Sequence, residues 1–196
     1  MCWFTVTSMS PAEYVVRSIR ADEWRAVKEL RLAALQDPVA YMAFMETYED
    51  AAGRPDRFWQ ERAVGAAGEA RERQQMVAEM PGGRWVGSVT VLVERAGATS
   101  VFGDVADVRQ GHLVAVYVRP EMRGRGLTEQ LFTHALEWAW EVAGVEQVRL
   151  FVDERNRRAE AFYRKFGFAP TGRSVPAPGD PGVRELEFLF LRGSRL

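Results

Sequence analysis

The sequence is poor in the residues that bind metals or form disulfides. Its 196 residues include one cysteine and two histidines. The single cysteine, Cys2, excludes an intramolecular disulfide and a cysteine metal cluster. With only His112 and His134 beside it, we expect no metal centre.

The chain also lacks an excess of charge of either sign. Lysine and arginine number 26 against 27 acidic residues, a net charge of -1, which argues against a nucleic-acid or membrane-surface partner. Any anion site must therefore be local. The sequence shows no signal-peptide pattern and no apolar run of membrane-spanning length, which predicts a cytoplasmic protein.

What is present suits one globular domain over residues 1–196, with a mobile N-terminus over 1–12, because 47% hydrophobic content suffices for one sizeable core. Alternation of apolar and polar residues predicts strands; these cover 14–20, 74–80, 85–94, 112–119, 147–153, a segment starting near 168, and 184–191. Helical patterns fill most of the intervals. The order predicts a mixed α/β (α+β) sheet of about seven largely antiparallel strands flanked by helices.

Local signals place the helix ends. Asp22 is the predicted N-cap of a first helix that Asp37-Pro38 ends, and Gly167 is a predicted left-handed C-terminal position. Two shorter helices are expected between 39 and 69, broken at 53–55. The longest helix begins at Leu127, and an apolar stripe is expected to mark its buried face; its members are Leu127, Leu131, Ala135, Trp138 and Val142.

Five aromatic residues between 39 and 69 recur at helical spacings; they are Tyr41, Phe44, Tyr48, Phe58 and Trp59. Two interpretations are open. The rings pack in the core, or they line a substrate wall, and spacing alone does not separate the two.

A glycine-rich turn precedes the longest helix. Arg123-Gly124-Arg125-Gly126 places unpaired backbone N–H groups at a helix N-terminus, where the helix dipole favours a phosphate. A P-loop would need lysine and a hydroxyl residue after Gly126, and a dinucleotide fingerprint would need glycine or alanine at Glu129, so both are excluded. Taken alone, the turn is equally well explained as structural.

A second segment adds a polar pair. Asn156 begins a helix, and Tyr163 lies seven residues later on the same face, so both can line one cleft. Phe162 and Phe166 lie four residues apart and are expected to anchor this helix to the sheet. The alternatives are that Asn156 is an N-cap and Tyr163 a packing ring.

The two segments together resemble the GNAT N-acetyltransferase superfamily. They are Val118-Arg119-Pro120-Glu121-Met122-Arg123-Gly124-Arg125-Gly126-Leu127 and Asn156-Arg157-Arg158-Ala159-Glu160-Ala161-Phe162-Tyr163-Arg164-Lys165-Phe166-Gly167-Phe168. The resemblance is strong over 111–168 and weaker over 14–95. It implies a sheet splayed between the fourth and fifth strands, with acetyl-CoA in the gap. One position departs from the family turn, because Thr128 stands where glycine or alanine is usual and brings both bulk and a hydroxyl to the phosphates.

The resemblance also assigns roles. Backbone groups of Val116 and Val118 would meet the pantetheine arm, Asn156 would touch the cofactor near its thiol, and Tyr163 would be the general acid. The pyrophosphate would bind the turn, formed by Arg123, Gly124, Arg125, Gly126, Leu127 and Thr128.

The implied function is transfer of an acetyl group from acetyl-CoA to a primary amine of a small molecule or peptide, by direct attack of the amine. Val118 N–H is the candidate to stabilise the oxyanion. The alternatives are a non-catalytic acyl-CoA-binding or sensing module and a protein N-terminal or lysine acetyltransferase. A homodimer is left open.

His112 is the predicted base, because it begins the strand that leads to Val118, at a place where related sequences often carry glutamate, and an imidazole suits a base near neutral pH. Four carboxylates are the alternatives: Glu46, Glu49, Asp104 and Asp107.

Overall fold

The computed structural model describes residues 14–100 and 103–193; the predicted mobile segment 1–12 lies outside them. The helices are α1 (Trp24–Leu35), α2 (Tyr48–Ala52), α3 (Asp56–Val64), α4 (Leu127–Glu141) and α5 (Arg157–Phe166), with short 3-10 helices η1 (Ala40–Met42) and η2 (Pro120–Met122). The strands are β1 (Val15–Ser18), β2 (Arg73–Glu79), β3 (Trp85–Glu94), β4 (Gln110–Val118), β5 (Gln147–Asp153), β6 (Ala169–Ala177) and β7 (Asp180–Leu191).

The strands form one seven-stranded sheet in the order β1-β2-β3-β4-β5-β7-β6. Every neighbouring pair is antiparallel except β4 and β5, which are parallel. The predicted mixed, largely antiparallel sheet flanked by helices is therefore confirmed.

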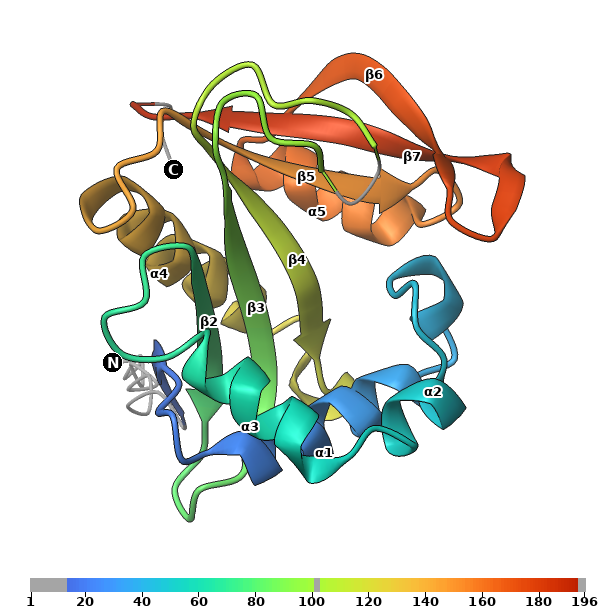
Figure 1. The fold of residues 1–196 in the computed structure, drawn as a ribbon. Coiled ribbons are helices and arrows are strands. Elements are labelled where there is room, and N and C mark those ends of the chain that lie inside the picture. Colours follow the sequence, from blue (N-terminus) through green and yellow to red (C-terminus); the bar gives the residue numbers. More distant parts are fainter. Residues whose placement is uncertain (1–13, 101–102, 194–196) are drawn as a thin grey trace, which may run out of the picture.

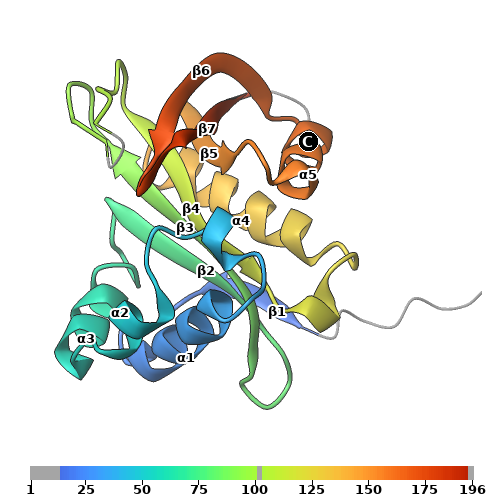
Figure 2. The same cartoon turned by 90° about the vertical axis from the view of Figure 1, so that its right-hand side faces the viewer.

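The sheet opens between β4 and β5. These strands pair only at Gln110–Gln147, Gly111–Val148 and His112–Arg149, and the rest of β4 has no partner on β5. In Figure 1, β4 runs down and away from β5 and β7, which cross the top of the view. The segment that contains η1 approaches this opening from the side of α1 (Figures 1 and 2).

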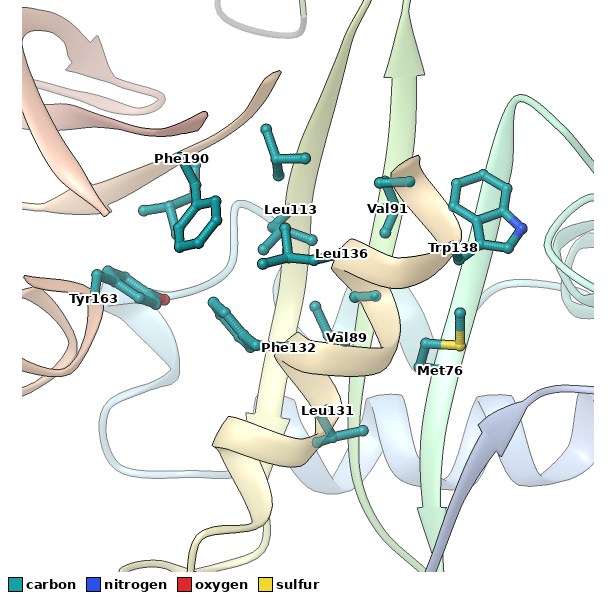
Figure 3. Close-up of a cluster of buried hydrophobic side chains, with 14 of the residues drawn as sticks. Met76, Val89, Val91, Leu113, Leu131, Phe132, Leu136, Trp138, Tyr163 and Phe190 are labelled. Carbon is teal, nitrogen blue, oxygen red and sulfur yellow. The ribbon is translucent and has the colours of Figure 1, made fainter. Parts of the chain in front are cut away.

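Two hydrophobic cores lie on opposite faces of the sheet (Figure 2). On one face α4 packs on β2, β3 and β4, with its buried Leu131, Phe132, Leu136 and Trp138 turned toward the strands (Figure 3). On the other face α1 and α3 cover the sheet around the buried Trp59. The second face is covered over β2 to β4, which leaves room beside β5 and β7.

α5 is held to α4 as well as to the sheet. The rings of Phe162 and Phe166 lie 5.4 and 5.3 Å from that of Phe132 on α4, and Phe166 lies 6.0 Å from Phe190 on β7. Edge-to-face pairs of this kind contribute about 0.5–1.5 kcal/mol each beyond their buried area. The expected anchoring therefore runs through the long helix too, and it fixes where α5 begins.

A bulge interrupts β4 where the sheet opens. Ser88 pairs with Tyr117 and Thr90 with Val114, so Ala115 and Val116 together oppose one residue of β3. Ala115 has a φ of 53°, in the left-handed region that a non-glycine residue rarely adopts. The bulge re-aims the second half of β4 into the opening.

Two local predictions were wrong. The N-cap of α1 is Glu23 rather than Asp22, and no side chain caps this helix end, because Glu23 instead binds Arg17, at 2.6 Å. Val142 does not continue the α4 stripe, since the helix ends at Glu141 and Val142 is 39% exposed. Across the described residues, no helix combines the length and apolarity that a membrane crossing needs.

Candidate active site

A cavity of about 510 Å³ follows the glycine-rich turn, and we call it the turn cavity. Its walls come from β4, the turn before α4, the N-terminal half of α5, and the segment around η1. The sequence-predicted residues that line it are Val116, Val118, Arg123, Gly124, Gly126, Thr128, Asn156 and Tyr163. The structure thus gathers two segments about 30 residues apart in sequence onto one cleft.

Gly126 fixes the geometry of the turn. It is the N-cap of α4 with a φ of 78°, and a Cβ added there would meet nothing within 4 Å. Glycine is the residue that adopts this left-handed conformation without strain. No side chain caps this helix end, so its first amides are available to an anion.

The two arginines of the turn, both predicted at the cofactor, differ in their surroundings. The Nε atom of Arg123 donates to the carbonyl oxygen of Val118 at 2.9 Å, and its Nη2 pairs with the carboxylate of Asp37. Arg123 therefore ties the turn to β4 and to the segment after α1. Arg125 is exposed and does not line the turn cavity.

Leu127, also predicted at the cofactor, turns its side chain into the core, where it is 1% exposed. Only its backbone is placed to meet a ligand. Thr128 lines the cavity in the first turn of α4, next to Glu129, so the hydroxyl and bulk that distinguish this turn do face the cleft.

The backbone of β4 offers a donor to the opening. Arg119 N–H donates to Val86 O on β3 at 2.9 Å. Because successive N–H groups of a strand point to opposite sides, Val118 N–H points away from β3. It faces the side on which β5 has diverged, which is the turn cavity.

A second cavity, of about 290 Å³, lies on the uncovered part of the sheet, and we call it the strand cavity. Its walls come from β3, β4, β5, the end of β6, the start of β7, α5, η1, α1 and α3. The charged and titratable side chains that line it are Arg31, Tyr41, Arg62, His112, Asp153, Arg155, Tyr163, Asp180 and Glu185. Acidic groups are concentrated on β5 and β7, and arginines on α1 and α3.

The two cavities meet at a small set of shared residues. Seven residues line both of them: Met42, Ala43, Phe44, Val116, Arg155, Asn156 and Tyr163. Asn156 is also the N-cap of α5, with Oδ1 accepting from Ala159 N at 3.2 Å, so the capping interpretation is correct and does not remove it from the cleft.

Tyr163 is 8% exposed and stacks on Phe132 at 5.8 Å (Figure 3). Its hydroxyl forms no hydrogen bond with any described residue. Burial raises the pKa of Tyr163 above its ordinary value, and the nearby charge of Glu185 adds to the rise. The phenol therefore keeps its proton over a wide pH range at the junction of the cavities.

His112 lies in the wall of the strand cavity but is 2% exposed. Its Nδ1 is 3.0 Å from Glu94 Oε1, and Glu94 also binds Arg149 at 2.8 Å. Burial would raise the pKa of Glu94, but the hydrogen bonds from His112 and Arg149 outweigh it and hold the pKa at about 2. His112 therefore lies in the wall of the strand cavity and also belongs to a buried polar network.

The alternative bases lie elsewhere. Glu46 pairs with Arg31 at 3.1 Å, and Asp104 with Arg149 at 2.5 Å. Neither these carboxylates nor Glu49 and Asp107 line the two cavities. The carboxylate that does line the strand cavity with a strongly perturbed pKa is Glu185, which the sequence analysis missed.

The five rings of the aromatic segment divide between the core and the cavity walls. Trp59 is a core residue at 1% exposure, and Tyr48 and Phe58 pack against the same core. Phe44 lines both cavities, and Tyr41, 67% exposed, lines the strand cavity with the Arg155 guanidinium 5.5 Å from its ring.

Comparison with known proteins gives the family. Residues 24–168 match the model of the acetyltransferase (GNAT) family. The chain is 38% identical over 63 residues to the peptidyl-lysine N-acetyltransferase YjaB of Salmonella typhimurium, a match that covers 32% of this chain and 39% of that protein. It is 37% identical over 71 residues to the mycothiol acetyltransferase of Beutenbergia cavernae, which covers 36% of this chain and 24% of that protein. The chain thus spans about two fifths and one quarter of these relatives.

Solved structures agree in fold. The spermidine N-acetyltransferase of Vibrio cholerae in complex with CoA and spermine matches with a TM-score of 0.60 at 14% identity, over 94% of this chain and 98% of that one. Arabidopsis thaliana NAA60 in complex with a bisubstrate analogue matches with a TM-score of 0.62 at 13% identity, over 93% and 99%.

Proposed function

The chain belongs to the acetyltransferase (GNAT) family, and on this premise we propose that it transfers the acetyl group of acetyl-CoA to a primary amine. The observation that carries the proposal is the meeting of two cavities at Tyr163, one built on a helix N-terminus and the other with the carboxylates of β5 and β7 on one wall. The first cavity suits an anionic donor, and the acidic wall of the second suits the ammonium group of an acceptor.

The turn cavity fits coenzyme A in size and chemistry. Its volume of about 510 Å³ falls in the range of about 300–1,000 Å³ that is usual for small-molecule sites. Amides of the turn from Gly124 to Thr128 would bind the pyrophosphate at the N-terminus of α4. Backbone groups of Val116 and Val118 on the unpaired half of β4 would hold the pantetheine arm, and Asn156 would lie near the thiol.

In this account three groups of the protein act on the reaction. A base in the strand cavity takes a proton from the acceptor's ammonium group, so that a neutral amine reaches the acetyl carbonyl carbon. Val118 N–H, turned toward the opening, stabilises the negative charge on the carbonyl oxygen. Tyr163 gives its proton to the departing sulfur. No serine or cysteine nucleophile is required. His112 is the base that the sequence predicts.

There are two further candidate functions. One has a protein lysine as the acceptor, and the other has no acceptor because it binds acyl-CoA without transfer. The match to a peptidyl-lysine N-acetyltransferase favours a lysine side chain of a protein as the amine, and a strand cavity of about 290 Å³ can hold such a side chain. A module that binds acyl-CoA without turnover would need the turn cavity. It would need neither a second cavity with an acidic wall nor Tyr163 between the two cavities.

The function is tested by incubating the protein with acetyl-CoA and a panel of small amines, amino acids and lysine peptides. Release of free thiol is followed in time, and products are identified by mass spectrometry. Thiol release that depends on one class of amine, with the matching acetylated product, is expected. Tight binding of acetyl-CoA with no turnover on any amine would favour the binding module.

A further inference from the structure

Glu185 and Asp153 form a pair of carboxylates on the wall of the strand cavity. They are directly opposite each other in the antiparallel pairing of β7 with β5. Side chains so placed lie on one face with Cβ atoms about 4.5–5.5 Å apart, and like charges there repel. The pair therefore calls for a proton or a cation.

Only one member of the pair has a cation among the described residues. Asp153 accepts from Arg155 at 2.6 Å (Nη2 to Oδ2) and 3.0 Å (Nε to Oδ1). The carboxylate of Glu185 forms no hydrogen bond and no ion pair with any residue of 14–100 or 103–193, although it is half-buried. It is a carboxylate that faces the cavity without a bonded partner.

The surroundings of Glu185 place it next to the reaction. The charge of Glu185 contributes to the raised pKa of Tyr163. The ionisation of Glu185 is in turn opposed by the negative charge of Asp153 and favoured by the positive charge of Arg155. Asp180 and His112 line the same cavity from β7 and β4. Burial, together with the charge of Asp153, raises the pKa of Glu185 to about 7, which is where a general base works near neutral pH.

We propose that Glu185 receives the acceptor's ammonium group in the strand cavity and is the base that takes its proton. This proposal rests on the proposed acetyl transfer. Glu185 accepts one proton from the ammonium, and the nitrogen lone pair forms the C–N bond as the C–S bond breaks. Tyr163 protonates the sulfur, and the excess proton on nitrogen restores Tyr163. The proton on Glu185 leaves to solvent with the product.

The kinetic test is the pH profile of kcat/KM for Glu185→Gln, with a primary amine that the wild type acetylates. We expect a fall of about 10²–10⁴-fold at the optimum and loss of the acidic limb near pH 7. Glu185→Asp should keep the limb and regain part of the rate. Asp180→Asn, which removes one negative charge from the same cavity, should keep the limb. An unchanged rate and limb in Glu185→Gln would overturn the role and leave acetyl transfer standing.

A second readout needs no substrate. The folded-state pKa of Glu185 lies above the ordinary value, so its contribution to stability is complete below the unfolded pKa and is lost as the pH rises through 7. Relative to wild type, Glu185→Gln should therefore gain free energy of unfolding between about pH 5 and pH 8. A difference that does not change with pH would contradict the cavity environment described here.

A different observation concerns the opposite wall. Arg62 of α3 is half-buried in the strand cavity and forms no hydrogen bond or ion pair with any described residue. Burial, with repulsion from Arg31 and Arg73, lowers the pKa of Arg62 to about 10. The nearby carboxylate of Glu46 is already held by Arg31, at 3.1 Å. An uncompensated guanidinium in a cavity is a site for an anion.

We infer that the acceptor carries an anionic group, such as a carboxylate, that binds Arg62 while its amine lies at the acidic wall. The test compares KM for an amino acid that the wild type acetylates with KM for the same amine bearing a carboxamide. We expect the wild type to favour the carboxylate by about tenfold or more, the usual value of a charge-assisted hydrogen bond. Arg62→Met should abolish this preference by raising KM for the carboxylate to about that for the amide, and Arg62→Lys should retain part of it. Equal KM values in the wild type would overturn the inference but not the acetyl transfer.

Discussion

The two cavities differ in how the chain builds them. The turn cavity is built around two short segments, the turn at 123–128 and the start of α5, with β4 and the segment around η1 completing its walls. The strand cavity is made of side chains from nine elements spread between Arg31 and Glu185. A ligand that is the same in every member of a family can be bound by a compact motif. The acceptor, which varies, is selected by side chains that the fold collects from distant positions.

A substitution in the turn tests the difference between the two cavities, and there we expect the largest effect, on acetyl-CoA affinity. Gly126→Glu places a carboxylate against the phosphates and a side chain on a left-handed residue, so acetyl-CoA affinity should fall by at least about 100-fold. Gly144→Glu is the matched control, because Gly144 also has a positive φ, of 63°, with open space around it at the other end of α4. Both variants should lose similar stability in a thermal melt, and only the first should lose the ligand in a calorimetric titration. Retained affinity in a folded Gly126→Glu would show that the turn is only structural.

The junction of the cavities gives the next largest effect. Tyr163→Phe should lower kcat by about 10²–10⁴-fold while acetyl-CoA affinity stays nearly unchanged, because only the transferable proton is removed. Tyr48→Phe removes a hydroxyl from a ring that packs on the second core and should leave kcat close to that of the wild type. The measurements are steady-state kinetics and equilibrium binding. A near-normal kcat in Tyr163→Phe would reduce this residue to a packing ring.

His112→Ala separates the two candidate bases. Because His112 is buried and bound to Glu94, its loss should lower the free energy of unfolding by about 1–3 kcal/mol, measured by denaturant titration. If Glu185 is the base, the acidic limb of kcat/KM persists in this variant. Disappearance of the limb in His112→Ala, with its persistence in Glu185→Gln, would return the role to the histidine that the sequence predicts.

The smallest effect is that of the ligand on the intact protein. Acetyl-CoA or free CoA at about 100 times its dissociation constant adds about 2.7 kcal/mol to the stability of the folded state. For a chain of this length the thermal midpoint should rise by about 5–10 °C. A melt that neither form of CoA moves would remove the assignment of the turn cavity.

The sequence predicts the first cavity far better than the second for a physical reason. Gly126, Asn156 and Tyr163 act through local geometry, namely a left-handed turn, a helix cap and a helix face, and these can be inferred from neighbouring residues. The strands of the sheet can likewise be inferred from neighbouring residues, because each shows a local alternation of apolar and polar side chains. Val142 was misplaced because the helix ends one residue earlier than its apolar pattern.

Glu185 and Arg62 carry no such local signal. Along β7, the alternation of Leu186, Phe188 and Phe190 indicates a buried face, so Glu185 reads as a solvent-facing residue. Its environment depends on the register that sets Asp153 opposite it. It also depends on the positions of α1 and α3, the described helices on that face, which cover β2 to β4 instead. Arg62 likewise looks like an exposed residue of a short helix until α3 packs on α1 and places it in the wall of the strand cavity.

The measurement that tests the two-cavity account most directly is an amide chemical-shift map of the protein titrated first with CoA and then with the best acceptor amine. We predict that CoA moves the resonances of Val118, Gly124, Gly126 and Thr128 and leaves those of Arg62 and Glu185 nearly still. The amine should then do the reverse, with Tyr163 moved by both. Large shifts of Arg62 and Glu185 on addition of CoA, or none in the turn, would contradict the account.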